Sequence, residues 1–330
     1  MKSQILTPCD TPILFIIFNR PNYTKKVFDT IKKAKPTQLF IAADGPHPDN
    51  PQDHELCKQT RAIINLIDWE CEVKALFQDQ KLGCGKGVST AIDWFFDHVE
   101  QGIILEDDCV PNESFFPFCT ELLEKYKNDE SIMMISGTSY LFNKETSPYN
   151  YFFSRYFAIW GWATWKRAWK KFDFYIPDWR IKKHPRSLFI IFKNIQITKF
   201  WTNYFDQIKN KKLNAWSIQW GYTCIFNHGL AITPFHNLIS NIGAEGVHYH
   251  NDNKNPLLHL YTKNIQFPLN HPPRIVLNKK LNAMLFKNLG ITSSKNILLS
   301  IKKLLYLPKK IGFRLVHKIK KKLFYYINKK

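Results

Sequence analysis

Long apolar runs, paired cysteines and acidic residues near the C-terminus are all missing from this sequence, and each absence excludes a class of protein. No stretch reaches the roughly 18 consecutive apolar residues of a membrane-spanning helix. The seven cysteines are odd in number and scattered, and they include no C-x-x-C pair. This pattern argues against a disulfide framework and against a zinc site, and it indicates a reducing compartment.

The positive charge is concentrated in one part of the chain. Residues 254–330 contain 18 Lys and Arg but no Asp or Glu, so the first 252 residues carry only about +2 of the formal net charge of +20. Over residues 295–330 apolar residues are interleaved with lysines, and Pro308 divides this stretch into two short helical segments. Such a basic amphipathic tail is typical of a membrane interface, and a disordered basic tail is the alternative.

The first hundred residues alternate between two patterns. Apolar runs at 12–18, 38–44, 71–78 and 102–106 predict strands, and residues with helical spacing at 22–34, 53–67 and 87–99 predict helices between them. The run at 12–18 ends in Asn-Arg-Pro without a small-residue cleavage site, so we interpret it as a strand and not as a signal peptide. The order predicts an α/β fold with a mostly parallel central sheet and helices on both faces. A helix at 112–128 and a strand at 131–137 follow.

Polar side chains follow three of these predicted strands at the point where each strand ends. They are Asn19 and Arg20, Asp44, and the triplet Glu106, Asp107 and Asp108. Because ligands bind beyond the carboxyl ends of parallel strands, these residues predict one crevice. Clustered carboxylates there suit Mg²⁺ or Mn²⁺ bound together with ligand phosphates, which indicates a nucleotide-utilising transferase. The alternative is that the triplet is a solvated loop before the next helix.

Two further segments each allow a functional and a structural interpretation. The Gly-rich stretch 79–91 opens a helix, and its backbone N–H groups with Lys86 could face a phosphate, although a simple turn explains it equally well. The stretch 149–179 is dense in aromatic residues, most of which belong to the core. Trp160, Trp162 and Trp165 follow the predicted sheet, and one or two of them could stack on a sugar ring.

At this point the sequence resembles a known family. The segment "ILEDDCVPNESFF" resembles the metal-binding segment of glycosyltransferases with the GT-A fold, a Rossmann-like nucleotide-diphospho-sugar transferase fold. "PILFIIFNRPNYTKKVFDTI" and "LFIAADGP" look like the opening strands of the N-acetylglucosaminyltransferase I-like branch, and "GWATWKRAW" and "LISNIG" look like segments of related bacterial surface-polysaccharide transferases. The resemblance covers residues 10–250, and its ordered set of segments is more specific than the acidic triplet alone.

The resemblance implies roles for individual residues of the donor site. It implies that Asp108 is the main ligand of Mn²⁺ or Mg²⁺, and that Glu106 and Asp107 contact the sugar or ribose or hold metal-bound water. Asp44 would contact the uracil or ribose, and Asn19 and Arg20 would lie near the nucleotide. In GT-A enzymes a late His completes the metal or phosphate site, and here His248 is the candidate, although a surface residue is the alternative.

The general base is the point at which this sequence departs from the family pattern. An inverting transferase needs a carboxylate to take the proton of the acceptor hydroxyl. The resemblance implies an acid within a W-x-x-Q-W segment, but Ser217 occupies that position in this chain. Asp206, Asp178 and Glu245 are the neighbouring acids, and the choice among them stays open.

Together these observations predict a catalytic domain at 1–250, a connecting segment at 251–290 and a basic membrane-associating tail at 291–330. Within the domain, residues 10–140 would bind the nucleotide-sugar and 149–250 the acceptor. The expected activity is a metal-dependent hexosyl or N-acetylhexosaminyl transfer from a UDP-sugar to a surface glycan or lipid-linked acceptor. The expected location is cytoplasmic, on the inner face of the cell membrane. A catalytically decayed, membrane-tethered binding protein is the alternative. Nucleic-acid binding is less favoured, because the near-neutral body predicts no dedicated nucleic-acid site.

Overall fold

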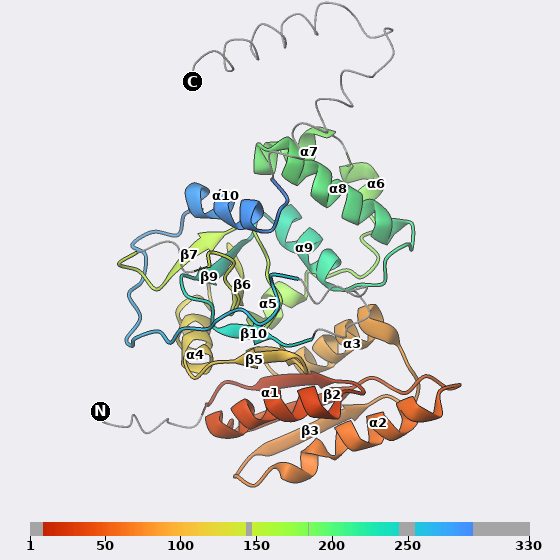
Figure 1. The fold of residues 1–330 in the computed structure, drawn as a ribbon. Coiled ribbons are helices and arrows are strands. Elements are labelled where there is room, and N and C mark those ends of the chain that lie inside the picture. The colour runs from red at the N-terminus through yellow and green to blue at the C-terminus, as the bar shows by residue number, and fades with distance from the viewer. Residues whose placement is uncertain (1–8, 143–146, 184, 244–254, 293–330) are drawn as a thin grey trace, which may run out of the picture. The chain divides into compact units, whose positions relative to one another are not determined.

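The computed structural model describes residues 9–142, 147–183, 185–243 and 255–292, and its centre is an eight-stranded sheet (Figure 1). The strand order is β3-β2-β1-β4-β8-β6-β9-β7. The strands of this sheet are β1 (Ile13–Ile17), β2 (Gln38–Ala43), β3 (Glu72–Phe77), β4 (Gln101–Glu106), β6 (Ile132–Ser136), β7 (Tyr151–Ser154), β8 (Trp162–Trp165) and β9 (Leu230–Pro234). A second sheet pairs β5 (Cys109–Pro111) antiparallel with β10 (Ile239–Asn241).

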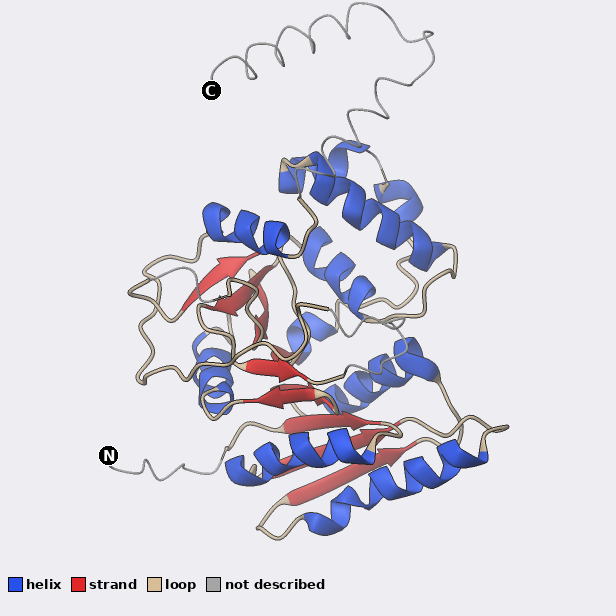
Figure 2. Ribbon diagram, in the orientation of Figure 1, coloured by secondary structure: helices blue, strands red, loops and turns tan. Residues whose placement is uncertain are grey.

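Helices cover both faces of the large sheet and extend beyond one end of it (Figure 2). Those of the N-terminal half are α1 (Pro21–Ala34), α2 (Pro51–Arg61), the 3-10 helix η1 (Ala62–Leu66), α3 (Gly83–His98) and α4 (Phe115–Lys125). Those of the C-terminal half are α5 (Lys166–Trp169), α6 (Trp179–Lys182), α7 (Pro185–Phe192), α8 (Ile195–Lys209), α9 (Ser217–Phe226) and α10 (Lys279–Asn288).

The predicted alternation of strands and helices is confirmed in the first half of the chain. Strands β1, β2, β3, β4 and β6 each agree with the predicted runs to within one residue at either end. The pairs β1–β2, β2–β3 and β1–β4 are all parallel. The helix predicted at 112–128 is shorter at both ends. It begins after Ser114, whose N–H donates to the side chain of Asn112.

Strand β1 explains why helices pack on both faces. All five of its residues are buried, and successive side chains point to opposite faces of a strand. Ile13, Phe15 and Ile17 belong to the core that includes α1, whereas Leu14 and Ile16 belong to the core that includes α3. A continuous apolar run is therefore what this position requires.

The second half of the sheet is mixed. Strand β8 lies between β4 and β6 and is antiparallel to both, and β7 is antiparallel to β9. The sequence did not predict β8, because its residues WATW lie within a long aromatic stretch that shows no strand-length period. The observed sheet is thus mostly parallel, with antiparallel strands in its C-terminal half.

The segment predicted as a connection belongs to the folded unit. Ile265 and Leu269 are buried in the core on one face of the sheet, and Leu285 and Phe286 of α10 are buried as well. The described residues up to Ile291 belong to one compact unit. The tail from residue 293 lies outside the described residues. Within the described ranges, no helix is both long and apolar enough to cross a membrane.

Candidate functional site: the crevice between β1 and β4

The strand order creates a switch point between β1 and β4. The chain passes from β1 to β2 on one side, and it returns through α3 to β4 on the other side. Ligands of open α/β sheets bind at such a point, outside the carboxyl ends of the strands. Arg20 follows β1, and the acidic triplet begins at the last residue of β4. The structure brings these two strand ends together.

Arg20 is the residue that joins them. Its Nε donates to Oδ2 of Asp107 at 3.2 Å, and its Nη2 donates to Oδ1 of the same carboxylate. Nη2 also donates to Oδ2 of Asp108 at 3.1 Å. Burial acts to lower the pKa of Arg20, but the two carboxylates outweigh it and raise that pKa above its usual range. The guanidinium is therefore a permanent positive charge at the floor of the crevice.

The carboxylate of Asp107 is buried and engaged by Arg20. Its side chain is 4% exposed, and its two oxygens accept from Nε and Nη2 of Arg20 in bidentate geometry. Burial raises its pKa to about 6, against the opposing effect of Arg20. The implied contact of Asp107 with the sugar or ribose, or with metal-bound water, stays a prediction. In this structure the carboxylate of Asp107 positions Arg20.

Asp108 lies at the rim and is held by the small sheet. Its side chain is 18% exposed, and its Oδ1 accepts from Nδ2 of Asn241 at 3.3 Å. A Cβ on Gly243 would lie 2.3 Å from Oδ2 of Asp108, so any other residue there would displace this carboxylate. Asn241 and Gly243 were not identified individually as site residues. The signal that could have found them is the segment LISNIG, which already carried part of the resemblance.

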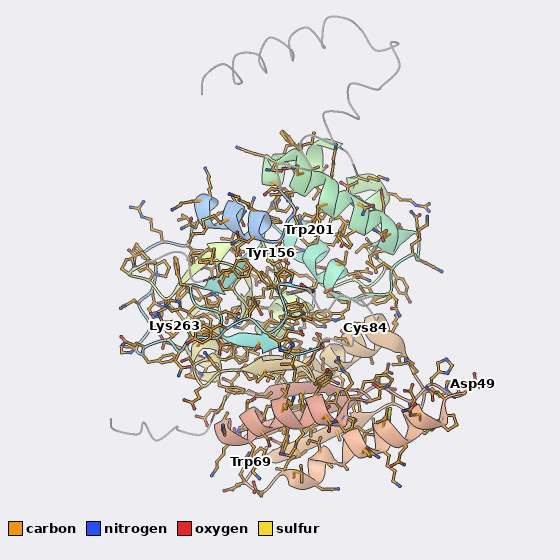
Figure 3. The ribbon with its side chains drawn as sticks, viewed as in Figure 1. Asp49, Trp69, Cys84, Tyr156, Trp201 and Lys263 are labelled. Atoms are coloured by element: carbon orange, nitrogen blue, oxygen red, sulfur yellow. The ribbon has the colours of Figure 1, made fainter. Side chains whose placement is uncertain are left out.

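Glu106 is the third carboxyl group at the end of β4. Burial, followed by the charges of Asp108 and Asp107, raises the pKa of Glu106 to about 8. Cys84 lies at the start of α3 (Figure 3) and is exposed. The carboxylates exceed the one guanidinium in charge, and the crevice therefore favours a cation.

The Glu106→Gln variant tests this electrostatic description. The carboxyl has an ordinary pKa of 4.5 and a folded-state pKa of about 8. Protonation therefore stabilises the folded state fully below pH 4.5, and this contribution is lost as the pH rises through 8. In metal-free buffer, the wild type should lose stability between pH 5 and pH 9, whereas Glu106→Gln should not lose it through this group. The unfolding free energy of Glu106→Gln minus that of wild type should therefore be about 2–3 kcal/mol higher at pH 9 than at pH 5. Urea unfolding at both pH values measures this.

Glu130→Gln is the matched control for that measurement. A hydrogen bond from Lys171 lowers the pKa of Glu130, so its replacement should give no gain at high pH. An unchanged difference between Glu106→Gln and wild type from pH 5 to pH 9 would contradict a raised pKa of Glu106.

Asp44 anchors the loop that precedes α3. Its Oδ1 accepts from the N–H of Leu82 at 2.7 Å and from that of Gly45 at 2.9 Å, and its Oδ2 accepts from the N–H of Gly83 at 2.9 Å. These bonds supply acceptors for the first N–H groups of the helix. The implied contact of Asp44 with uracil or ribose stays a prediction, and the three bonds leave it little free acceptor capacity.

Asn19 and Lys86 point to partners within the protein. The side-chain amide of Asn19 donates to Oδ1 of Asp53 at 2.7 Å, which ties the end of β1 to the first turn of α2. The Lys86 ammonium lies 4.4 Å from the ring centre of Phe174 and 4.6 Å from that of Tyr175. Among the described residues, no carboxylate is within salt-bridge distance of Lys86. The backbone N–H groups of this stretch are nevertheless engaged within the protein, because those of Leu82 and Gly83 donate to Asp44 and that of Gly85 donates to Asn214, which favours the structural interpretation of the Gly-rich stretch.

Trp162 is a core residue, which corrects its prediction as a sugar-stacking side chain. It is fully buried, and its ring stacks on that of Trp216 with centroids 5.6 Å apart. Trp169 and Trp220 complete the cluster. Trp165 is buried too, and its indole N–H donates to the carbonyl of Leu123. Of the tryptophans considered for a sugar, only Trp160 is partly exposed.

The candidate bases occupy structural positions. Asp206 accepts from the indole N–H of Trp179 at 2.9 Å and from Lys183 at 2.8 Å, which joins α6 to α8. Asp178 accepts from the hydroxyl of Tyr222 at 2.5 Å and pairs with Lys182. Burial of Asp178 acts to raise its pKa, but these two partners lower it overall, which weakens it as a base.

Ser217 begins α9 and is half-buried. It is no base at neutral pH, whatever its position. Glu245 and His248 lie outside the described residues. Within the described part of the chain, none of the candidate acids is therefore a free carboxylate suited to the role of base.

The residues of the crevice fit a cation that arrives with its ligand. Within the described ranges, no three His, Cys, Asp or Glu side chains are grouped as metal ligands. Asp107 is occupied by Arg20, and Asp108 is the carboxylate at the rim. Mg²⁺ is commonly bound by one or two carboxylates with the remaining positions filled by phosphate oxygens and water. The available carboxylate therefore suits a cation that is also bound by phosphate and water. It does not suit a metal site in which protein side chains supply all the ligands.

Comparisons with known proteins add little. No protein family matches the sequence, and no curated protein matches it. Among solved structures, the apo form of a UDP-glucose pyrophosphorylase is similar with a TM-score of 0.31 and 9% identity, over 67% of this chain and 90% of that chain. A UDP-glucose pyrophosphorylase complexed with UDP-glucose gives 0.26 and 14%, over 48% and 70%. Likeness at these scores carries no argument about function, which has to come from the crevice itself.

Proposed function

We propose that this protein is a glycosyltransferase that moves a hexosyl or N-acetylhexosaminyl group from a UDP-sugar to a surface glycan or a lipid-linked acceptor. The observation that carries the proposal is the meeting of Arg20 with Asp107 and Asp108 at the switch point between β1 and β4. A diphosphate is a ligand that would use both signs of charge there. Its accompanying cation needs a carboxylate, and its negatively charged oxygens need a guanidinium nearby.

In this proposal each residue of the crevice has a separate task. Asp108 would hold Mn²⁺ or Mg²⁺, which when bound offsets the charge of the leaving diphosphate. Arg20 orients the carboxylate of Asp108 through the 3.1 Å bond and adds a fixed positive charge. Asn241 holds the other oxygen of Asp108. Glu106, the last residue of β4, and Asp107 are the acids that we expect to contact the sugar or ribose or to hold metal-bound water.

We also propose a location for the enzyme. The basic tail at 295–330 would hold it on the inner face of the cell membrane, where lysines interact with anionic lipid headgroups. A lipid-linked acceptor would then be presented at the same surface. The charge distribution along the sequence supports this placement.

Titration of UDP by calorimetry, with and without Mn²⁺, tests the proposed donor. Because the crevice has an excess of carboxylates, a diphosphate alone is repelled, and we expect Mn²⁺ to raise the affinity for UDP by about tenfold or more. ADP serves as the control for base recognition. Negligible UDP binding under both conditions would contradict the proposal.

A binding protein without catalytic activity is the second candidate, and a specific observation favours it. Asp178 and Asp206 are engaged by other side chains, and serine stands at the position where the family pattern implies an acid. Such a protein would bind UDP with Mn²⁺ but would not hydrolyse a UDP-sugar. Detection of released UDP, which coupled assays measure directly, separates the two candidates.

A further inference from the structure

The helices α6, α7 and α8 expose apolar side chains that no other described part of the chain covers. Ile181 is 85% exposed, Ile190 67%, Ile195 57% and Phe189 46%. These four, which we call the outer face of α6–α8, fall within 15 residues of sequence. They make up four of the eleven large exposed apolar side chains among the described residues, so the exposure is clustered and not scattered.

Residues 188–192 of α7 are all apolar, although only the inner side of this part of the helix packs against the protein. Leu188 is buried in the core, the ring of Phe192 lies 5.9 Å from that of Phe286, and the carbonyl of Ile191 accepts from Arg155 at 2.9 Å. These contacts fix the helix without Phe189 or Ile190. A helical segment that is apolar over a full turn is normally enclosed, which indicates that a partner covers the outer side of residues 188–192.

Positive charge surrounds the outer face. Arg180, Lys193 and Lys199 are exposed, and no carboxylate of the described residues pairs with them. The nearby acids Asp178 and Asp206 are already neutralised by lysines of the same region. Residues 179–212 contain nine Lys and Arg against a single acid. The partner must therefore be apolar and negatively charged.

The combination of exposed apolar side chains and positive charge decides which partner covers the outer face of α6–α8. The chain's own C-terminal tail is strongly basic and would be repelled, and a second copy would bring the same positive charges to the contact. An anionic lipid bilayer satisfies both requirements, because apolar side chains enter the interface while lysines reach the headgroups. Figure 1 shows α6, α7 and α8 at the end of the folded unit away from α1 and α2.

We propose that the outer face of α6–α8 is a membrane-binding surface that inserts Phe189, Ile190 and Ile195 into an anionic bilayer. This inference does not depend on the donor chemistry of the crevice. It adds to the tail a second contact, made by the folded unit itself, and two contacts fix the orientation of a protein where one does not. The connection between α8 and α9 contacts the start of α3. There the N–H of Gly85 donates to Oδ1 of Asn214, a residue of this connection, at 3.2 Å.

Hydrogen exchange on the full chain tests the surface directly. With phosphatidylglycerol-containing vesicles, we expect amide exchange over residues 187–199 to slow several-fold relative to phosphatidylcholine vesicles, whether or not UDP is added. Exchange in this segment that is the same with both vesicle types would overturn the proposal, even if the protein still binds through its tail.

A pair of double variants gives the second readout. We expect Phe189→Ser/Ile190→Ser to weaken partition onto anionic vesicles by about tenfold or more. The matched control is Ile275→Ser/Val276→Ser, which removes another consecutive exposed apolar pair and should change partition less than twofold. Equal partition of the two double variants overturns the proposal. UDP titration of both variants is expected to match wild type, which separates this result from the donor site.

Discussion

Arg20→Ala should lower the free energy of unfolding by about 3–5 kcal/mol at pH 8, the largest loss of stability that we expect from a single crevice residue. The variant leaves Asp107, whose side chain is 4% exposed, without its bidentate partner. An unpaired buried carboxylate is costly because the protein cannot replace the water that it has lost. Denaturant unfolding of the metal-free protein measures the effect.

Two comparisons show whether the loss comes from the buried charge. Arg20→Met/Asp107→Leu removes both charges and should recover most of the stability, because an apolar pair of similar volume often replaces a buried ion pair at little cost. Lys32→Ala breaks an ion pair between side chains that are 40% and 64% exposed, and it should change the stability little because water screens such a pair. If Arg20→Ala cost no more than Lys32→Ala, the ion pair would not be the element that joins β1 to β4.

The crevice was predictable from the sequence because its residues follow directly from strand ends. The runs that became β1 and β4 are buried on both faces, and only such strands are apolar throughout. Once the alternating pattern is recognised, parallel pairing puts Arg20 and Asp108 at the same edge. Their contact spans 88 residues of sequence, but the order of the elements requires it.

The roles of individual residues were less predictable, because they depend on partners that no local pattern reveals. Asp107 and Asp108 are chemically identical neighbours, yet one is buried beneath Arg20 and the other lies at the rim. Asn241 meets Asp108 only because β10 pairs with β5 across 130 residues, and each of these strands is three residues long. Strands that short give no periodic signal.

The aromatic segments were the least predictable part of the chain. A tryptophan that stacks on a sugar and one that stacks on another tryptophan have the same sequence signature. Trp162 is of the second kind, because Trp216 and Trp220 lie against it from α9. Asp206 likewise looks like a free acid until Trp179 and Lys183 are placed beside it. Such roles can be assigned only when the neighbours in the folded structure are known, whereas the ends of strands can be predicted from the sequence.

Asp108→Asn should lower the rate of UDP-sugar hydrolysis at saturating substrate by about 100-fold or more, if the proposed transferase is correct. The asparagine oxygen can still accept from Asn241, so the small sheet should remain intact. What the variant loses is the negative charge at the rim of the crevice. The effect should therefore appear in the metal dependence of the reaction, with a higher Mn²⁺ concentration needed for half-maximal rate.

Affinity for UDP distinguishes this loss of charge from simple unfolding. Without metal, UDP should bind the Asp108→Asn variant at least as well as wild type, because one repelling carboxylate has been removed. With Mn²⁺, the gain in affinity seen for wild type should disappear. Asp68→Asn, which neutralises an exposed carboxylate on the surface, is the matched control and should leave both quantities unchanged. Turnover and Mn²⁺ dependence equal to wild type in Asp108→Asn would show that Asp108 does not bind the metal.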